Sequence, residues 1–198
     1  MKKAALLSVL CVTLAGPMVA ESISSREYEI KAAFLYNFAK FVEWPPDAFQ
    51  KNPGHFVIGI LGPDPFGSDL DDLLEGKTIQ DKSLVLKRIA IPQDATSCHV
   101  LFISSAKEEE LDSILIALKG LPVLTVSDMD QFIQRGGVVG FTLEGKKVRF
   151  SINTKVADQA GLKVSSQLLK LAKTVISRLP ETTTFAWLPF KIIPSDGS

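Results

Sequence analysis

Hydrophobic residues recur at two spacings along the chain, and these spacings predict where helices and strands lie. The helical spacing of three and four is clearest at Leu111, Ile114, Leu115 and Leu118. Ser105 and Glu108 form a capping-box pair before this stretch, and Gly120 follows it. We therefore predict a helix with one buried face that starts at Ser105 and ends near Gly120.

A first helix is predicted from Ser24, which has capping-box spacing with Glu27, to the Pro45–Pro46 pair. Its apolar residues cover most of the circumference and are Tyr28, Ile30, Ala33, Phe34, Tyr36, Phe38, Phe41 and Val42. A helix that is apolar nearly all round is either deeply buried or docked on another surface. We favour burial against a sheet, and docking of one face on a second molecule stays open.

Short apolar runs and one alternating pair predict the strands. The apolar runs are residues 56–61, 84–91, 100–104 and 123–126, and the alternating pair, 138–143 and 147–153, forms a hairpin around Glu144–Gly145. Further helices are expected at 64–74, where Asp64–Pro65 resembles a helix start, at 128–134, and at about 164–175. This order predicts an α/β fold with a mixed, mostly parallel sheet, an antiparallel hairpin and flanking helices.

The N-terminus has the pattern of a secretory signal. Lys2 and Lys3 precede an apolar run that reaches Ala15, Gly16–Pro17 breaks it, and Ala20 is a small residue at the expected cleavage point. We therefore expect residues 1–20 to be a cleaved signal peptide, residues 21–180 to form one α/β domain, and residues 181–198 to be a C-terminal tail. A retained N-terminal anchor is the alternative.

The net charge of the chain and the motifs that it lacks exclude several classes of function. After cleavage, 20 basic and 22 acidic side chains remain, so no basic excess favours nucleic acid. The sequence has no G-x-S-x-G motif and no zinc-binding spacing, and its two histidines leave few options for a catalytic triad. The loop after residues 56–61 lacks G-x-G-x-x-G. We expect no catalytic residues, metal or cofactor.

The hairpin offers the candidate contact surface. Alternation places Val148, Phe150 and Ile152 on one face and Lys147, Arg149 and Ser151 on the other, with Gly140 expected near Arg149. The candidate partner-binding residues are Glu144, Lys147, Arg149, Phe150 and Asn153. The alternative, which we favour for the charged face, is a solvated surface with a structural Arg–carboxylate pair.

Other polar residues have simpler interpretations. Cys98 precedes a buried strand and is expected to behave as a small apolar group, and an intermolecular disulfide is the alternative. His99 is expected at a strand edge. Two acidic clusters, Asp69–Asp71–Asp72 and Asp128–Asp130, are expected to cap helices rather than to bind a cation.

Three stretches together resemble the YfiR family of periplasmic regulators. They are EYEIKAAFLYNFAKFVEWP (27–45), CHVLFIS (98–104), and GGVVGFTLEGKKVRFSIN (136–153) followed by AGLKVSSQLLKLA (160–172). The resemblance implies a periplasmic α/β protein that represses a membrane-bound diguanylate cyclase by binding its periplasmic sensory domain. It also implies that an outer-membrane lipoprotein can sequester the repressor, and that the repressor is a homodimer.

One departure and two alternatives accompany this resemblance. The best known family member is stabilised by disulfides, whereas Cys98 has no cysteine partner once Cys11 is removed with the signal peptide. We therefore expect no internal disulfide switch. A small-molecule-binding sensory module is the runner-up hypothesis, and a periplasmic hydrolase is disfavoured by the missing motifs.

Overall fold

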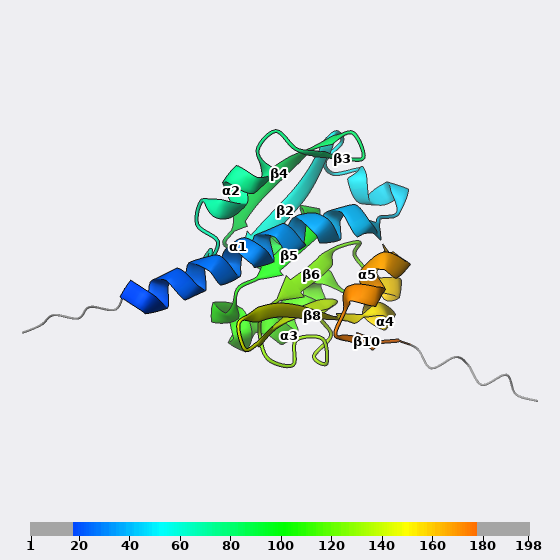
Figure 1. Cartoon of the computed structure of the whole chain (residues 1–198). Helices are drawn as coiled ribbons and strands as arrows, with labels where there is room; N and C mark the ends of the chain where they lie inside the picture. The colour runs from blue at the N-terminus through cyan, green and yellow to red at the C-terminus, as the bar shows by residue number, and fades with distance from the viewer. Residues whose placement is uncertain (1–17, 178–198) are drawn as a thin grey trace, which may run out of the picture.

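One mixed eight-stranded sheet organises the chain (Figure 1). The computed structural model describes residues 18–177, with side chains from residue 25 onward. The strand order is β10-β8-β7-β6-β5-β2-β4-β3. The bounds are β2 His55–Leu61, β3 Thr78–Ile79, β4 Lys82–Ile89, β5 Val100–Ile103, β6 Leu124–Ser127, β7 Val139–Glu144, β8 Lys147–Asn153 and β10 Thr174–Ile176. Only the β3–β4 and β7–β8 neighbours are antiparallel, so the predicted α/β fold is confirmed.

Helices and a small second sheet complete the described part. The α-helices are α1 Met18–Phe41, α2 Asp69–Leu74, α3 Leu111–Leu118, α4 Thr154–Gln159 and α5 Ser166–Leu171. The 3-10 helices are η1 Pro46–Phe49, η2 Pro92–Ser97 and η3 Ser105–Glu110. The second sheet pairs β1 (Val42–Glu43) with β9 (Lys163–Val164). This pairing joins the end of α1 to the segment between α4 and α5.

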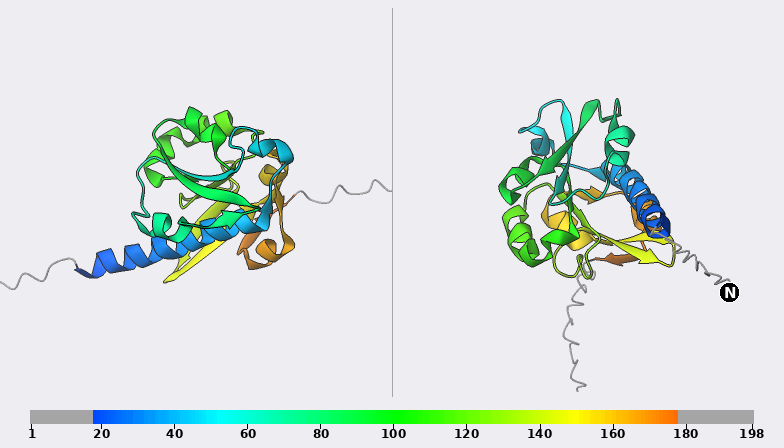
Figure 2. Two further views of the ribbon diagram at one scale, coloured as in Figure 1. Left: turned by 90° about the horizontal axis from the view of Figure 1, so that it is seen from above. Right: turned by 90° about the vertical axis from the view of Figure 1, so that its left-hand side faces the viewer.

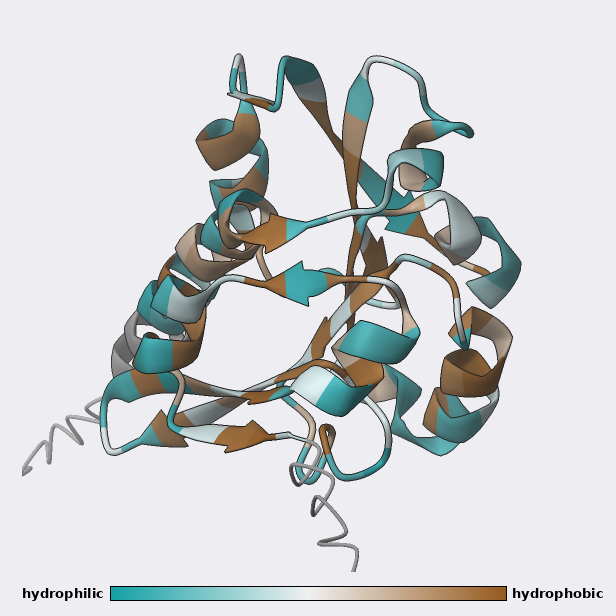
Figure 3. Cartoon of the chain, turned by 90° about the vertical axis from the view of Figure 1, so that its right-hand side faces the viewer, coloured by the Kyte–Doolittle hydropathy of each residue, from teal (hydrophilic) through white to brown (hydrophobic). Residues whose placement is uncertain are grey.

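Two hydrophobic cores lie on opposite faces of the sheet. Side chains alternate along a strand, so Phe56, Ile58 and Ile60 of β2 enter the core under α1, while Val57 and Leu61 enter the core under α3. Figure 2 shows α1 and α3 on opposite sides of the curled sheet. Figure 3 shows the brown, apolar segments running along the central strands, with teal at many of the loops.

The first helix is anchored by one apolar stripe, which confirms burial against the sheet. Ala32, Leu35, Phe38 and Ala39 are buried, whereas Ile30 on the other side is exposed. The helix starts at Met18, so Ser24 lies inside it and does not cap it, and it ends at Phe41, before the proline pair. Residues 1–17, which hold most of the expected signal peptide, lie outside the described residues.

Two further predicted helix starts are wrong. Asp64 accepts a hydrogen bond from the Phe66 amide at 2.7 Å, which forms a tight turn, and α2 begins only at Asp69. Ser105 opens the 3-10 helix η3, whose backbone is kinked at Lys107, and α3 begins only at Leu111. In both places, a local side-chain or backbone turn replaces the first helical turn that the capping pattern predicted.

The segment after the hairpin also differs from the prediction of one long helix. The short helices α4 and α5 are separated by β9, and Val175 lies in strand β10, which pairs with β8. Helix α4 was not predicted. Asn153 caps it by accepting a hydrogen bond from the Val156 amide at 3.2 Å. The expected tail, residues 181–198, lies beyond the described part of the chain.

Two smaller expectations are corrected. Residues 128–134 form turns rather than a helix, with Gln131 in the left-handed region at φ 54°. In the hairpin, Thr142 and not Gly140 is opposite Arg149, and Gly140 faces Ser151. The hairpin itself is confirmed, with Glu144 opposite Lys147 across the two-residue turn Gly145–Lys146.

Candidate partner-binding surface

The outward face of the hairpin carries a cluster of exposed charges, which we call the basic edge. It consists of Lys146, Lys147, Arg149 and Lys173 around Glu144. The Lys173 Nζ lies 2.5 Å from Glu144 Oε1, and the Arg149 Nε lies 3.7 Å from Glu144 Oε2. These ion pairs span β7, β8 and the residue before β10, because β8 lies between the other two strands.

The Arg149–Glu144 ion pair is the Arg–carboxylate pair that was favoured from the sequence for this solvated face. The hydrogen bond from Lys173, together with its charge, lowers the pKa of the Glu144 carboxyl. Glu144 therefore stays ionised at neutral pH, and the cluster keeps four positive charges against one negative charge. Exposed ion pairs such as these contribute little to stability, so their charges remain available to a partner.

Two predicted contact residues are not at the surface. Phe150 is 2% exposed and packs edge to face against Phe34 and Phe38, with ring centroids 5.3 Å and 5.2 Å away. Asn153 is also buried, and its side-chain amide donates to the Ile133 carbonyl at 2.9 Å. Phe150 anchors the hairpin to α1 and Asn153 caps α4, so only Glu144, Lys147 and Arg149 of the five candidate contact residues are exposed.

A buried ion cluster beside the hairpin was not predicted. The side chain of Lys31 is 4% exposed, and its Nζ lies 2.6 Å from both Glu27 Oε1 and Asp128 Oδ2. The Tyr28 hydroxyl donates to the same Asp128 oxygen at 2.8 Å. The pKa of Tyr28 is raised by burial and by the Asp128 charge. The sequence signal was a lysine on the apolar stripe of the first helix and an aspartate directly after β6.

This cluster borders a hollow of about 430 Å³ that reaches the hairpin. The hollow is lined by Glu27, Lys31, Asp128, Asp130, Phe141, Thr142 and Leu143. Asp128 holds α1 to the end of β6, so it does not cap a helix as predicted. Its Oδ1 atom is buried and has no hydrogen-bond partner among the described residues.

Cys98 lies in the core under α3. Its side chain is 4% exposed, and burial raises the pKa of the thiol to about 12. A Cβ atom on Gly59 would lie 2.5 Å from the sulfur, so glycine is needed there for space. Because a protonated, buried thiol reacts slowly, this position suits packing and not disulfide exchange.

His99 is buried and not at a strand edge as predicted. Its ring stacks between Phe49 and Phe56, at centroid distances of 4.6 Å and 4.7 Å. The Val57 amide donates to His99 Nδ1 at 2.9 Å, and the His99 amide donates back to the Val57 carbonyl. Burial lowers the pKa of His99 to about 4. The Val57 donor acts in the same direction, because protonated Nδ1 would face another N–H group.

The acidic start of α2 is an ion-pair site. Arg88 on β4 donates hydrogen bonds to both Asp64 and Asp71, and its hydrogen bond lowers the pKa of Asp71.

Within the described side chains, no group of three or more His, Cys, Asp or Glu residues is arranged to hold a metal ion. In residues 18–177, no helix is long and apolar enough to cross a bilayer.

The fold and this surface define a mixed α/β protein with a charged face backed by an aromatic core. The chain belongs to the YfiR/HmsC-like family, whose model matches residues 28–173. This is a family of periplasmic regulators of cyclic-di-GMP signalling, and it is regulatory rather than catalytic.

Solved structures give weaker likenesses. A conserved domain protein from Vibrio cholerae O1 biovar El Tor is 12% identical with a TM-score of 0.45, covering 75% of this chain and 60% of that one. The ABC domain of a Streptococcus pneumonia protein in complex with L-Trp is 10% identical with a TM-score of 0.45, covering 66% of this chain and 58% of that one. This chain thus spans about three fifths of each, and neither likeness carries an argument about function.

Proposed function

We propose that this protein represses a membrane-bound diguanylate cyclase by binding the cyclase's periplasmic sensory domain through the basic edge. The observation that carries the proposal is that an exposed basic cluster lies on a hairpin whose other face is packed firmly in the aromatic core. Phe150 and Phe141 fix the hairpin on α1, while Lys147 and Arg149 point outward from the same strand. A surface held in this way keeps its shape on binding, which lowers the entropic cost of association.

The partner's contact surface is expected to be acidic. Four positive charges around one carboxylate attract negative charge, and complementary charge mainly accelerates encounter and excludes wrong partners. An outer-membrane lipoprotein that competes for the repressor, and assembly of the repressor as a homodimer, belong to the same proposal. Both are what the resemblance to the YfiR family implies, and both are part of the proposal.

The cellular test is deletion of the gene in the source bacterium. Cytoplasmic cyclic-di-GMP should rise, and expression of the wild-type chain should return it to the starting level. An unchanged level after deletion, together with a failure to recover a cyclase when the tagged protein is pulled down from membranes, contradicts the proposal.

The surface is tested by charge reversal. A Lys147→Glu, Arg149→Glu variant should fold normally but fail to capture the cyclase and fail to lower cyclic-di-GMP. The matched control is Lys87→Glu, Lys155→Glu, which changes the net charge equally at two exposed lysines outside the basic edge. An equal loss of cyclase capture in both variants would show that binding depends on the net charge of the protein and not on this surface.

A small-molecule sensory role is the second candidate, because carboxylates line the hollow beside the hairpin. Asp128 Oδ1 is buried without a partner in the described region, and two further carboxylates line the same hollow. Such a site suits a small ligand that donates hydrogen bonds. Native mass spectrometry of the purified protein tests this role. A reproducible ligand that is lost in Asp128→Asn, with no protein partner captured, would favour it over repression.

A further inference from the structure

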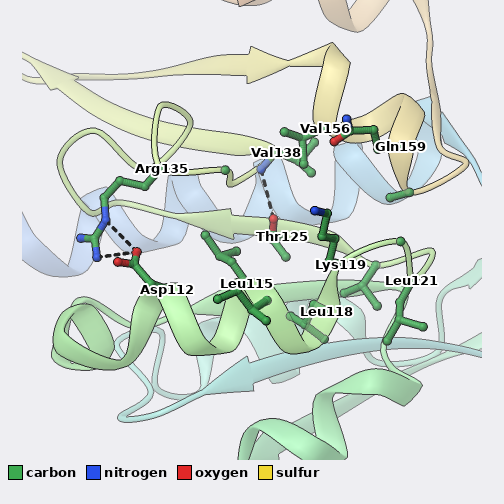
Figure 4. A pocket seen from close by; sticks show the side chains of 15 residues that line it. Asp112, Leu115, Leu118, Lys119, Leu121, Thr125, Arg135, Val138, Val156 and Gln159 are labelled. Atoms are coloured by element: carbon green, nitrogen blue, oxygen red, sulfur yellow. Dashed lines mark hydrogen bonds and ion pairs between the residues drawn. The ribbon is translucent and has the colours of Figure 1, made fainter.

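An apolar groove lies between α3 and α4, where side chains of both hydrophobic cores line it (Figure 4). Its volume is about 340 Å³, and its apolar lining includes Leu115, Ile116, Leu121, Val138, Val156 and Ala160. Ile116 is 74% exposed. Figure 4 shows the Arg135–Asp112 pair at one end and Lys119 and Gln159 toward the other. An exposed apolar hollow with polar ends is typical of a docking site.

The described chain ends close to this groove. Strand β10 runs beside α4, where the Thr154 hydroxyl donates to the Ile176 carbonyl at 3.1 Å. The Ile176 side chain packs against the same hydrophobic cluster that Leu115 and Leu121 cover. Residues beyond Ser177 therefore start from the side of the molecule that carries the groove.

The sequence beyond residue 177 has the composition of a docking segment. Residues 185–193 read FAWLPFKII and contain a single charge, Lys191. Leaving a tryptophan, two phenylalanines and a leucine in water costs on the order of 1.5–3 kcal/mol for each large apolar side chain. Pro189 and Pro194 disfavour a helix, so the segment suits an extended conformation laid along a groove.

The length of the connecting chain and the volume of the groove are also compatible with docking of this segment. The eight residue-to-residue steps from Ser177 to Phe185 span at most about 29 Å when extended, which allows the segment to return to a groove on the same side. The groove is at the small end of the range of about 300–1,000 Å³ for ligand pockets, so it suits one or two side chains and not a folded domain.

From this placement we infer that residues 185–190 dock in the α3–α4 groove of their own chain, with Trp187 as the principal anchor. The groove is then an intramolecular docking surface. This inference does not rest on the proposed repression of a cyclase. It is independent of the basic edge, whose residues do not line the groove.

Fluorine NMR on the mature chain, residues 21–198, with 5-fluorotryptophan tests the docking. The chain has two tryptophans, Trp44 and Trp187, and Trp187→Phe assigns their resonances. In the wild type, the Trp187 resonance should be shifted away from its position in a free peptide of residues 178–198. Ile116→Glu should move it to the free position, and Ile91→Glu, an exposed isoleucine outside the groove, should not. A wild-type resonance already at the free position overturns the inference, as does equal insensitivity to both variants.

A second measurement separates the chain's own segment from that of another copy. A photo-crosslinking amino acid at position 116 should join to residues 185–190 within a monomer of unchanged mass. Cross-linked dimers, or a Trp187 shift that disappears on dilution, would assign the groove to a second copy and overturn docking in the same chain. Because Ile116 is largely exposed, both changes at this position should leave the fold intact, as circular dichroism will check.

Discussion

At the scale of single residues, His99 joins three parts of the fold through one ring and its backbone. Its Nδ1 accepts from Val57, its carbonyl accepts from Leu124 and from the Trp44 indole, and its ring lies between two phenylalanines. These contacts require a neutral imidazole, because Nδ1 has to accept a hydrogen bond. The residue thus links the protonation of one side chain to the stability of the core.

Stability should consequently fall as the pH is lowered from about 6.5 to about 4. The unfolded chain protonates His99 near its ordinary pKa of about 6.5, whereas the folded pKa is about 4. The full contribution is present above the unfolded value and is lost through this window, up to about 3 kcal/mol. Urea unfolding at a series of pH values measures it. His99→Asn should be less stable at pH 7 but should show a shallower pH dependence, and equal slopes in the two proteins would contradict the assignment.

The Lys31 cluster should respond strongly to removal of one charge. Lys31→Met leaves the Asp128 carboxylate buried without its cation, which costs about 3–5 kcal/mol. Removing both charges in Lys31→Met, Asp128→Leu should recover much of that loss, because apolar residues often replace a buried ion pair without penalty. Denaturant unfolding of the wild type, Lys31→Met, Asp128→Leu and the double variant checks the sign of the coupling. A double variant as unstable as the sum of its singles would contradict it.

At the scale of elements, the β7–β8 hairpin separates two roles along one strand. Residues of one parity enter the aromatic core under α1, and those of the other parity make the basic edge. Since the side-chain period of a strand is two, a register slip of one residue would exchange the roles and bury the charges. The short turn at Gly145–Lys146 fixes the register. It therefore keeps the aromatic residues in the core and the charged residues on the basic edge.

Substitutions at adjacent positions of β8 should therefore differ sharply. Phe150→Ala should destabilise the protein by about 3–5 kcal/mol, because it removes a buried ring from the core. Arg149→Ala should change stability by less than about 1 kcal/mol, because its ion pair with Glu144 is exposed. Thermal and denaturant unfolding compare the two. Similar losses would show that the outward face is structural and is not available to a partner.

The sequence predicted elements well where one strong period ran uninterrupted. The β8 bounds matched at both ends, and the parity of Val148, Phe150 and Ile152 was confirmed by the register. Prediction failed over 164–175, where the periodic leucines belong to a helix of six residues and Val175 pairs with β8. Tertiary pairing decided the conformation there, and local spacing contains no information about the pairing of Val175 with Ile152, a residue 23 positions earlier.

The candidate surface was predicted only in part for a related reason. Charges on one strand face are visible from alternation, so Lys147 and Arg149 were identified. Lys173 joins them through the pairing of β10 with β8, which no local pattern shows. The Lys31–Asp128 pair joins residues that are 97 positions apart, and one sequence carries no signal of such a contact.

At the scale of the whole molecule, the charged surface lies on one side of the sheet's curled end and the apolar groove lies between helices on another. Lys146, Lys147, Arg149 and Lys173 form the first, and α3 and α4 border the second. The two surfaces differ in chemistry as well as in place. A partner steered by charge and a segment held by apolar burial would therefore bind without competing directly.

Salt dependence provides the molecular-scale test of how the basic edge works. If association with the cyclase domain is steered by these charges, the association rate constant should fall as sodium chloride rises from about 50 to about 500 mM, since the screening length shortens from about 14 Å to about 4 Å. The dissociation rate should change much less, because close contacts are screened less than distant charges. Lys147→Glu, Arg149→Glu should both slow association at low salt and flatten its salt dependence, while the Lys87→Glu, Lys155→Glu control keeps most of it. Stopped-flow or surface-plasmon measurements at several salt concentrations give both rates. A wild-type association rate that is independent of salt would exclude the basic edge as the steering surface even if the cyclase is the true partner.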